Sequence, residues 1–151
     1  MTMMPKNIAI IGGSGAIGGA FTKCLSDTYP DATIHVFSRH TPDNNLANVA
    51  YHSINYQDES SIADCASIAS QEMSLDMVII ATGILHEDKL MPEKSLKELS
   101  AEKFQRLFVV NTVTPALLGK HFLPKLSREN RSLFAALSAR VGSISDNQLG
   151  G

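Results

Sequence analysis

The first residues that could do chemistry are three glycines, spaced three residues apart, that follow the first apolar run of the chain. Residues 7–11 are rich in β-branched side chains, and Gly12, Gly15 and Gly18 come directly after them. Between a strand and a helix, such glycines permit a sharp turn, a close approach of backbone to a diphosphate, and close packing of the helix on the strand. The free N–H groups and positive dipole end of the helix would then face the phosphates. The pattern predicts a dinucleotide-binding turn, the alternative being a turn without ligand. The residues expected at the cofactor here are Gly12, Ser14, Gly15, Ala16, Ile17 and Gly18.

The end of the second apolar run indicates which dinucleotide is bound. A site that prefers NAD offers Asp or Glu to the ribose hydroxyls about 20 residues beyond the glycines. Ser38 and Arg39 stand in this region, and neither is an acid. A carboxylate would repel a 2′-phosphate, whereas a guanidinium pairs with it and can stack on adenine. Ser38 and Arg39 therefore favour NADP(H) over NAD, the alternative being a solvated loop arginine.

Short apolar runs alternate with longer segments of helical period, and these elements must position the site. Strands are expected at residues 7–11, 32–37, 49–54, 75–81 and 132–137, and helices at 16–28, 58–70 and 101–122. This alternation predicts an α/β fold with a doubly wound parallel sheet, Rossmann-like, in the strand order 3-2-1-4-5. Pro115 is expected to kink the long helix, because its ring clashes with the carbonyl four residues earlier. The fifth strand would leave an unprotected edge, so we expect residues 1–151 to be a single domain whose C-terminal part is missing.

Composition and charge exclude several other classes of protein. With 44% hydrophobic residues and a net charge of −2, the chain is not disordered and lacks the basic excess that nucleic acid requires. No apolar run approaches the ~20 residues that span a bilayer. Cys24 and Cys65 lack the spacing of a metal or redox motif, which fits a reducing, cytoplasmic location. His35 and His40 have no partners at metal-ligand spacing, so no metal site is expected.

Along its whole length the chain resembles the short-chain dehydrogenase/reductase family, and within it the C-factor-like branch, most strongly in four segments. They are the glycine turn and residues 78–83 (VIIATG), 108–111 (FVVN) and 134–143 (FAALSARVGS). The resemblance implies a larger doubly wound domain that moves a hydride between a nicotinamide and the carbon of a carbonyl or alcohol substrate. It also implies that the intact protein is a homo-oligomer, assembled through the long helix and the helix that follows it.

The resemblance gives roles to three candidate catalytic residues. Asn111 matches the helix asparagine that helps to hold the catalytic lysine and a proton-relay water, the alternative being a buried side chain satisfied by neighbouring strand backbone. Ser138 matches the serine that hydrogen-bonds the substrate oxygen, but it stands one residue earlier than in many relatives. Ser143 is therefore the other candidate. The alternative is that both serines satisfy loop backbone.

The resemblance also extends the expected cofactor site beyond the glycine turn. Ala81, Thr82 and Gly83 stand where the family has Asn-Asn-Ala-Gly, and Gly83 still permits close approach to the cofactor ribose. Asn55 stands where an acid commonly contacts adenine. The side-chain amides that brace the central sheet in the family are absent from residues 81–83.

The family's Tyr-x-x-x-Lys motif is missing from the 151 residues. Tyr29, Tyr51 and Tyr56 are the three tyrosines, and none is followed four residues later by lysine. A positioned acid/base contributes about 10²–10⁴ in rate, so the chain as given is expected to be an inactive part of an NADP(H)-dependent oxidoreductase. The alternative is a non-catalytic NADP(H)-binding or regulatory module, which the departures at residues 55, 81–82 and 139 favour.

Overall fold

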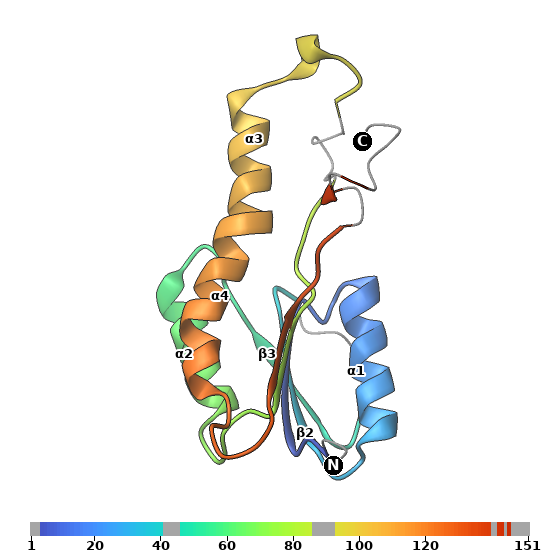
Figure 1. The fold of residues 1–151 in the computed structure, drawn as a ribbon, viewed down its shortest axis with the longest axis vertical. Helices are drawn as coiled ribbons and strands as arrows, with labels where there is room; N and C mark the ends of the chain where they lie inside the picture. Colours follow the sequence, from blue (N-terminus) through green and yellow to red (C-terminus); the bar gives the residue numbers. More distant parts are fainter. Residues whose placement is uncertain (1–3, 41–45, 86–92, 140–141, 144, 146–151) are drawn as a thin grey trace.

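Five parallel strands form one sheet in the order β3-β2-β1-β4-β5, as predicted. The computed structural model describes residues 4–40, 46–85, 93–139, 142, 143 and 145 (Figure 1). The strands are β1 (Asn7–Ile11), β2 (Thr33–Ser38), β3 (Val49–Ser53), β4 (Met77–Ile80) and β5 (Leu133–Ala136). The strand order reverses between β1 and β4, which in a doubly wound sheet is the place where ligands bind.

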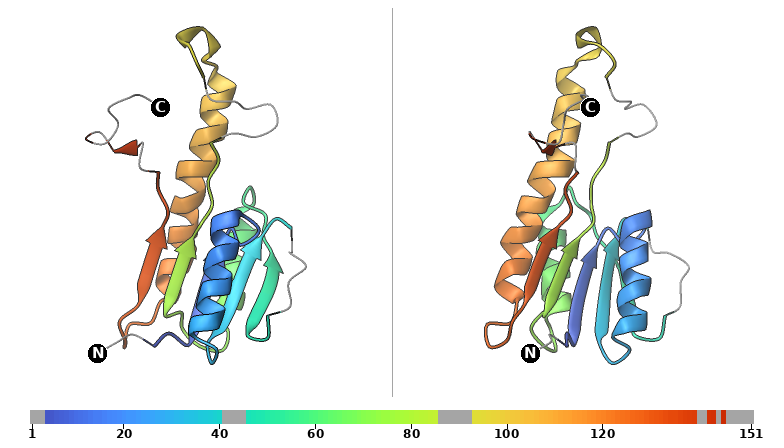
Figure 2. Two further views of the ribbon diagram at one scale, coloured as in Figure 1. Left: turned by 90° about the vertical axis from the view of Figure 1, so that its right-hand side faces the viewer. Right: turned by 45° about the vertical axis from the view of Figure 1, so that its right-hand side comes forward.

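Helices lie on both faces of the sheet (Figure 1). Helix α1 (Ala16–Thr28) covers one face, while α2 (Glu59–Ala69) and α4 (Thr114–Phe122) cover the other. Helix α3 (Ala101–Phe108) continues beyond the carboxyl ends of the strands (Figure 2). Short 3₁₀ turns precede α3 at Leu96–Glu98 (η1) and follow α4 at Leu123–Lys125 (η3). Within the described residues, no helix has the length and apolar character needed to cross a membrane.

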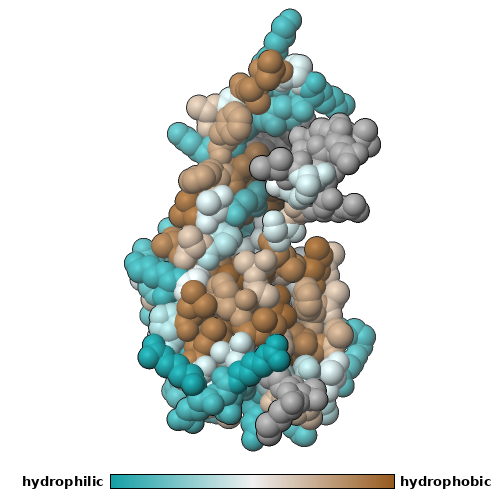
Figure 3. Space-filling model, in the orientation of Figure 1, coloured by the Kyte–Doolittle hydropathy of each residue, from teal (hydrophilic) through white to brown (hydrophobic). Residues whose placement is uncertain are grey.

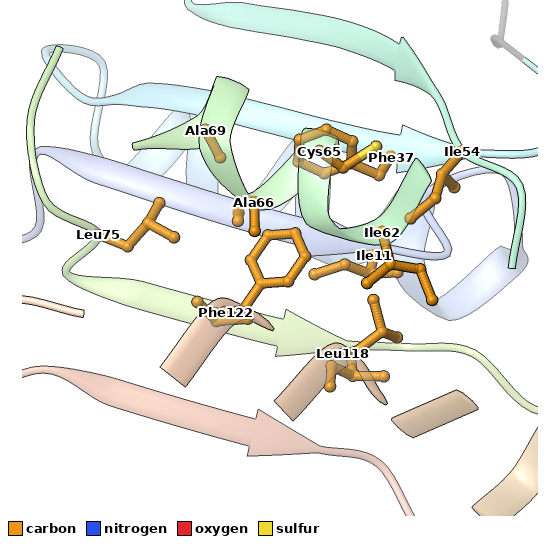
Figure 4. Packing of buried hydrophobic residues seen from close by; sticks show 13 residues of the cluster. Ile11, Phe37, Ile54, Ile62, Cys65, Ala66, Ala69, Leu75, Leu118 and Phe122 are labelled. Atoms are coloured by element: carbon orange, nitrogen blue, oxygen red, sulfur yellow. The ribbon is translucent and has the colours of Figure 1, made fainter. Parts of the chain in front are cut away.

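The core consists of two apolar layers that β1 separates. Every residue of β1 is buried, because side chains of alternate residues enter opposite layers. Ile8 and Ile10 join the layer below α1. Ile11 joins the layer below α2 and α4, where Phe122 meets Phe37 edge to face with ring centroids 5.9 Å apart (Figure 4).

The predicted long helix changes its winding immediately before Pro115. Residues Val109–Val113 form a π-helical turn (η2), in which the backbone N–H of Thr114 donates to the carbonyl of Val109. The Thr114 hydroxyl donates to the same carbonyl at 3.0 Å. A proline ring clashes with the ordinary α-helical path, and a wider turn is one way for a helix to accommodate it. The disturbance expected from Pro115 therefore lies in the turn that precedes it.

The β5 side of the sheet is open among the described residues. Strand β5 pairs with β4 alone, and Leu133 and Leu137 at this edge are 43% and 40% exposed. On α3, Phe104 and Phe108 are 57% and 61% exposed. Figure 3 shows apolar side chains gathered on this side of the molecule. The unprotected edge that the sequence predicts is present, whereas residues 140–141, 144 and 146–151 of the expected terminal segment lie outside the described residues.

Candidate functional site

The turn between β1 and α1 leaves the first N–H groups of the helix free of side-chain caps. Gly12 has a φ of 92°, a left-handed conformation that favours glycine. Its amide donates to the carbonyl of Phe37 at 2.8 Å, and the amide of Gly15 donates to the carbonyl of Gly12 at 3.1 Å. Gly15 is the N-cap of α1; no side chain of the described residues caps this end, and its first turn holds no acid. Such an end offers backbone donors and a positive dipole to an anion.

Two glycines are required by close packing around this turn. A Cβ on Gly18 would lie 2.2 Å from the carbonyl oxygen of Gly12. A Cβ on Gly12 would lie 2.8 Å from the carbonyl oxygen of Ala81. The turn therefore fits tightly between α1 and the end of β4, as expected for the first and third glycines of the motif.

A cleft of about 450 Å³ opens at the carboxyl ends of the strands, beside the glycine turn. Many of the predicted cofactor residues converge on it from separate parts of the sequence. Those that line it are Gly12, Ser14, Gly15, Arg39, Asn55, Ala81, Thr82 and Gly83. Two arginines, Arg39 and Arg106, line the cleft, and no Asp or Glu does so among the described residues. The cleft therefore has the polarity that a diphosphate needs.

The remaining predicted cofactor residues lie elsewhere. Ser38 is buried, and its hydroxyl donates to the carbonyl of His40 at 2.6 Å. Gly18 lies beneath the turn, and Ile17 is 59% exposed on α1. Ala16, the first residue of α1, is exposed and does not line the cleft.

The cleft also contains residues that sequence reasoning missed. These are Tyr56, Gln57, Ile84, Arg106, Val109, Val110 and Thr114. Val110 precedes Asn111 in the sequence, and Tyr56 and Gln57 follow Asn55. Their position beside predicted site residues is the feature of the sequence that could have indicated them. The side-chain oxygen of Asn55 accepts a hydrogen bond from the backbone amide of Gln57 at 3.0 Å. This bond holds residues 55–57, at the edge of the cleft, in a local turn.

Tyr56 is the cleft residue with the most perturbed acidity. Burial raises the pKa of its phenol to about 12, and the nearby charge of Arg39 only partly offsets this. A phenol with so high a pKa stays protonated and can donate a hydrogen bond throughout the neutral range.

Asn111 holds the backbone that follows β4 rather than lining the cleft. Its side-chain oxygen accepts a hydrogen bond from the backbone amide of Ile84 at 2.9 Å. Its side-chain nitrogen donates a hydrogen bond to the carbonyl of Ile84 at 2.8 Å. The π-helical turn carries Asn111 opposite this segment. Asn111 is therefore a residue that positions the cleft wall at Ile84.

Replacing Asn111 with aspartate should loosen this wall. Aspartate still accepts a hydrogen bond from the Ile84 amide, but it cannot donate one to the Ile84 carbonyl. Its carboxylate oxygen would instead repel the carbonyl oxygen of Ile84. We expect a local cost of about 1 kcal/mol, seen as roughly fivefold faster hydrogen exchange of the Ile84 amide. Asn111→Ala should have a larger effect, and the neighbouring exposed Thr112→Ala should have none. Equal exchange in all three variants would contradict this role.

The two candidate serines follow β5 and do not line the cleft. Ser138 is exposed, and the Ser143 hydroxyl lies 3.1 Å from that of Ser145. Arg140 and Val141 of the resembling segment lie outside the described residues.

His35, one of the two histidines left without a role in the sequence reasoning, forms a pair with His52. His35 Nδ1 lies 3.1 Å from His52 Nε2, and the two rings stack with centroids 5.3 Å apart. Burial lowers the pKa of both imidazoles, and for His35 the charge of His52 lowers it further. In the parts of the chain that the structure describes, no group of three or more potential ligands could hold a metal ion.

Comparison with known proteins identifies the fold. No family model matches the chain, and a search of curated proteins finds no relative. Solved structures match along nearly the whole chain. The NADPH-bound carbonyl reductase from chicken fatty liver superposes with a TM-score of 0.81 at 20% identity, over 98% of this chain and 62% of that one. A Burkholderia multivorans protein described as a short-chain dehydrogenase/reductase, with bound NADP, gives 0.80 at 18% identity, over 97% and 64%.

A third solved structure extends the same comparison. Sniffer of Caenorhabditis elegans, described as a carbonyl reductase, gives a TM-score of 0.85 at 20% identity, over 98% of this chain and 69% of that one. The chain thus has the Rossmann-like fold of these proteins, and it spans 62% of the length of the chicken reductase.

Proposed function

We propose that this chain binds NADP(H) and belongs to an NADP(H)-dependent oxidoreductase of the short-chain dehydrogenase/reductase family, in its C-factor-like branch. The observation that carries the proposal is the uncapped start of α1, opening on a cleft that holds Arg39 and no acid among the described residues. In this arrangement the diphosphate binds at the helix N-terminus and Arg39 receives the 2′-phosphate. The bound nicotinamide supplies the hydride chemistry, with a carbonyl or alcohol as the substrate.

The residues of the chain divide into a binding set and a positioning set under this proposal. Gly12, Ser14 and Gly15 hold the diphosphate, while Ala81–Gly83 border a ribose of the cofactor. Asn111 positions the wall at Ile84. Ser138 or Ser143 would approach the substrate oxygen in the complete active site.

The chain by itself is proposed to bind cofactor without turnover, because no tyrosine in it is followed four residues later by lysine. A non-catalytic NADP(H)-binding or regulatory module is the second candidate. It is favoured by Ala81 and Thr82, which stand where the family carries side-chain amides.

Homo-oligomer formation by the intact protein is part of the proposal. It is supported by the exposed aromatic residues Phe104 and Phe108 on α3 and by the edge of β5, which pairs with β4 alone among the described residues. Apolar surface of this kind is usually covered by another chain or another segment.

Titration with reduced dinucleotides tests the proposed function. We expect NADPH to bind the 151-residue chain saturably and more tightly than NADH. Binding is measured as a change in the fluorescence of the reduced nicotinamide, and no tryptophan in the sequence interferes with this signal. Absence of binding by both dinucleotides would refute the proposal. Reduction of a carbonyl substrate by the same chain would refute its inactivity and leave the binding site intact.

A further inference from the structure

Two residues that line the cleft carry a hydroxyl group that is buried without a hydrogen-bond partner among the described residues. These groups are the phenol of Tyr56 and the side-chain hydroxyl of Thr82. Both residues line the cleft of about 450 Å³. A buried polar group without a partner costs about 1–3 kcal/mol, so native proteins rarely keep one unless a ligand or an ordered water completes it.

Tyr56 follows β3 and lines the cleft from that side. Its ring packs against the apolar layer below α2 and α4. Gly12, Arg39 and Tyr56 line the same cleft. The amide of Gly12 already donates to Phe37, so it does not satisfy the Tyr56 hydroxyl.

Thr82 approaches the glycine turn from the β4 side. A Cβ on Gly12 would lie 3.1 Å from the backbone nitrogen of Thr82, so the two residues are in close contact. Gly12 and Thr82 therefore line adjoining parts of the cleft.

We propose that the hydroxyls of Tyr56 and Thr82 hydrogen-bond to the adenosine ribose-phosphate of the bound dinucleotide, with Tyr56 donating beside Arg39. This inference rests on the proposed function and deepens it. In a doubly wound sheet, the side chain at the end of the second strand meets the adenosine ribose, so Arg39 marks the adenosine end of the cleft. A ribose with its phosphate presents several oxygens that two hydroxyl donors can satisfy.

Tyr56→Phe tests the proposal, and Tyr51→Phe is its matched control. The Tyr51 hydroxyl is also buried without a partner among the described residues, but its ring packs on the opposite face of the sheet and does not line the cleft. With 2′,5′-ADP as the probe of the adenosine end, we expect Tyr56→Phe to weaken binding about 5- to 10-fold and Thr82→Val to weaken it by a similar factor. Tyr51→Phe should bind within about twofold of the wild type.

Thermal unfolding without nucleotide separates a ligand contact from a structural one. Removing an unpartnered buried hydroxyl leaves the free chain as stable or makes it more stable, so both phenylalanine variants should keep or raise the wild-type Tm. A lower Tm for Tyr56→Phe alone, or unchanged 2′,5′-ADP affinity in that variant, would overturn the proposal while dinucleotide binding by the wild type stands. If the wild type binds neither 2′,5′-ADP nor NADPH, both the proposed function and this inference are refuted.

Discussion

Gly18→Ala is expected to lower the free energy of unfolding by about 3 kcal/mol and to abolish dinucleotide binding. The added methyl group would lie 2.2 Å from the Gly12 oxygen, 2.8 Å from its carbonyl carbon and 3.0 Å from the Cα of Gly13. All three are backbone atoms of a tight turn, so no side chain can rotate away. Relief requires α1 to move away from β1, which displaces the same N–H groups that are proposed to bind the diphosphate. Denaturant unfolding followed by circular dichroism measures the loss.

Gly19→Ala is the matched control for this prediction. It adds the same methyl group one residue later in the same helix, where the nearest atom is the Gly13 oxygen at 3.5 Å, an ordinary contact. Alanine is better than glycine in a helix interior, so this variant should gain about 0.5–1 kcal/mol. Equal stabilities for the two variants would show that α1 does not pack on the turn as described.

The strand order and much of the cleft could be predicted because both follow from rules that act along the chain. Strands buried between two helical layers appear as short apolar runs, as in Met77–Ile80. The carboxyl ends of parallel strands meet at one edge, so residues that follow separate strands must converge. Gly12, Arg39, Asn55 and Gly83 meet in this way.

Ser38 shows why the direction of one side chain could not be predicted. The structure extends β2 to Ser38, one residue beyond the expected end. Alternate side chains of a strand point to the same face, so Ser38 shares the face of Ile34 and Val36, which belong to the layer below α1. The hydroxyl of Ser38 therefore points away from the cleft. The expected strand ended one residue too early, so the alternation of side chains was not extended to Ser38.

The long helix shows a second limit of periodic patterns. Phe104, Phe108 and Leu118 recur at helical spacing, and a regular helix over residues 101–122 would place them on one face. The π-helical turn of residues 109–113 inserts extra backbone and rotates the two halves relative to each other. Leu118 is buried, whereas Phe104 and Phe108 are exposed. Val109 and Val110 of the π-helical turn line the cleft, together with Arg106 and Thr114 on either side of it.

Arg39→Glu is expected to reverse the preference of the cleft from NADPH to NADH. A charge-assisted hydrogen bond to a phosphate contributes about 1.5–3 kcal/mol, and a carboxylate in the same place repels the 2′-phosphate. We therefore expect NADPH affinity to fall by about 100-fold or more. NADH should bind as tightly as before or more tightly, because a carboxylate at the end of the second strand accepts the ribose hydroxyls. Titration of each variant with both reduced dinucleotides measures the two affinities independently.

Conservative variants separate the charge of Arg39 from its geometry. Arg39→Lys keeps the positive charge but loses the planar pair of donors, so its NADPH affinity should lie between those of the wild type and Arg39→Ala. Arg39 is exposed, so none of these variants should change the Tm of the free chain appreciably. Added salt should reduce the NADPH preference of the wild type, because an exposed ion pair is screened, and should leave that of Arg39→Ala unchanged. If NADPH and NADH weaken by the same factor in Arg39→Glu, the guanidinium does not recognise the 2′-phosphate and selectivity must come from another part of the cleft.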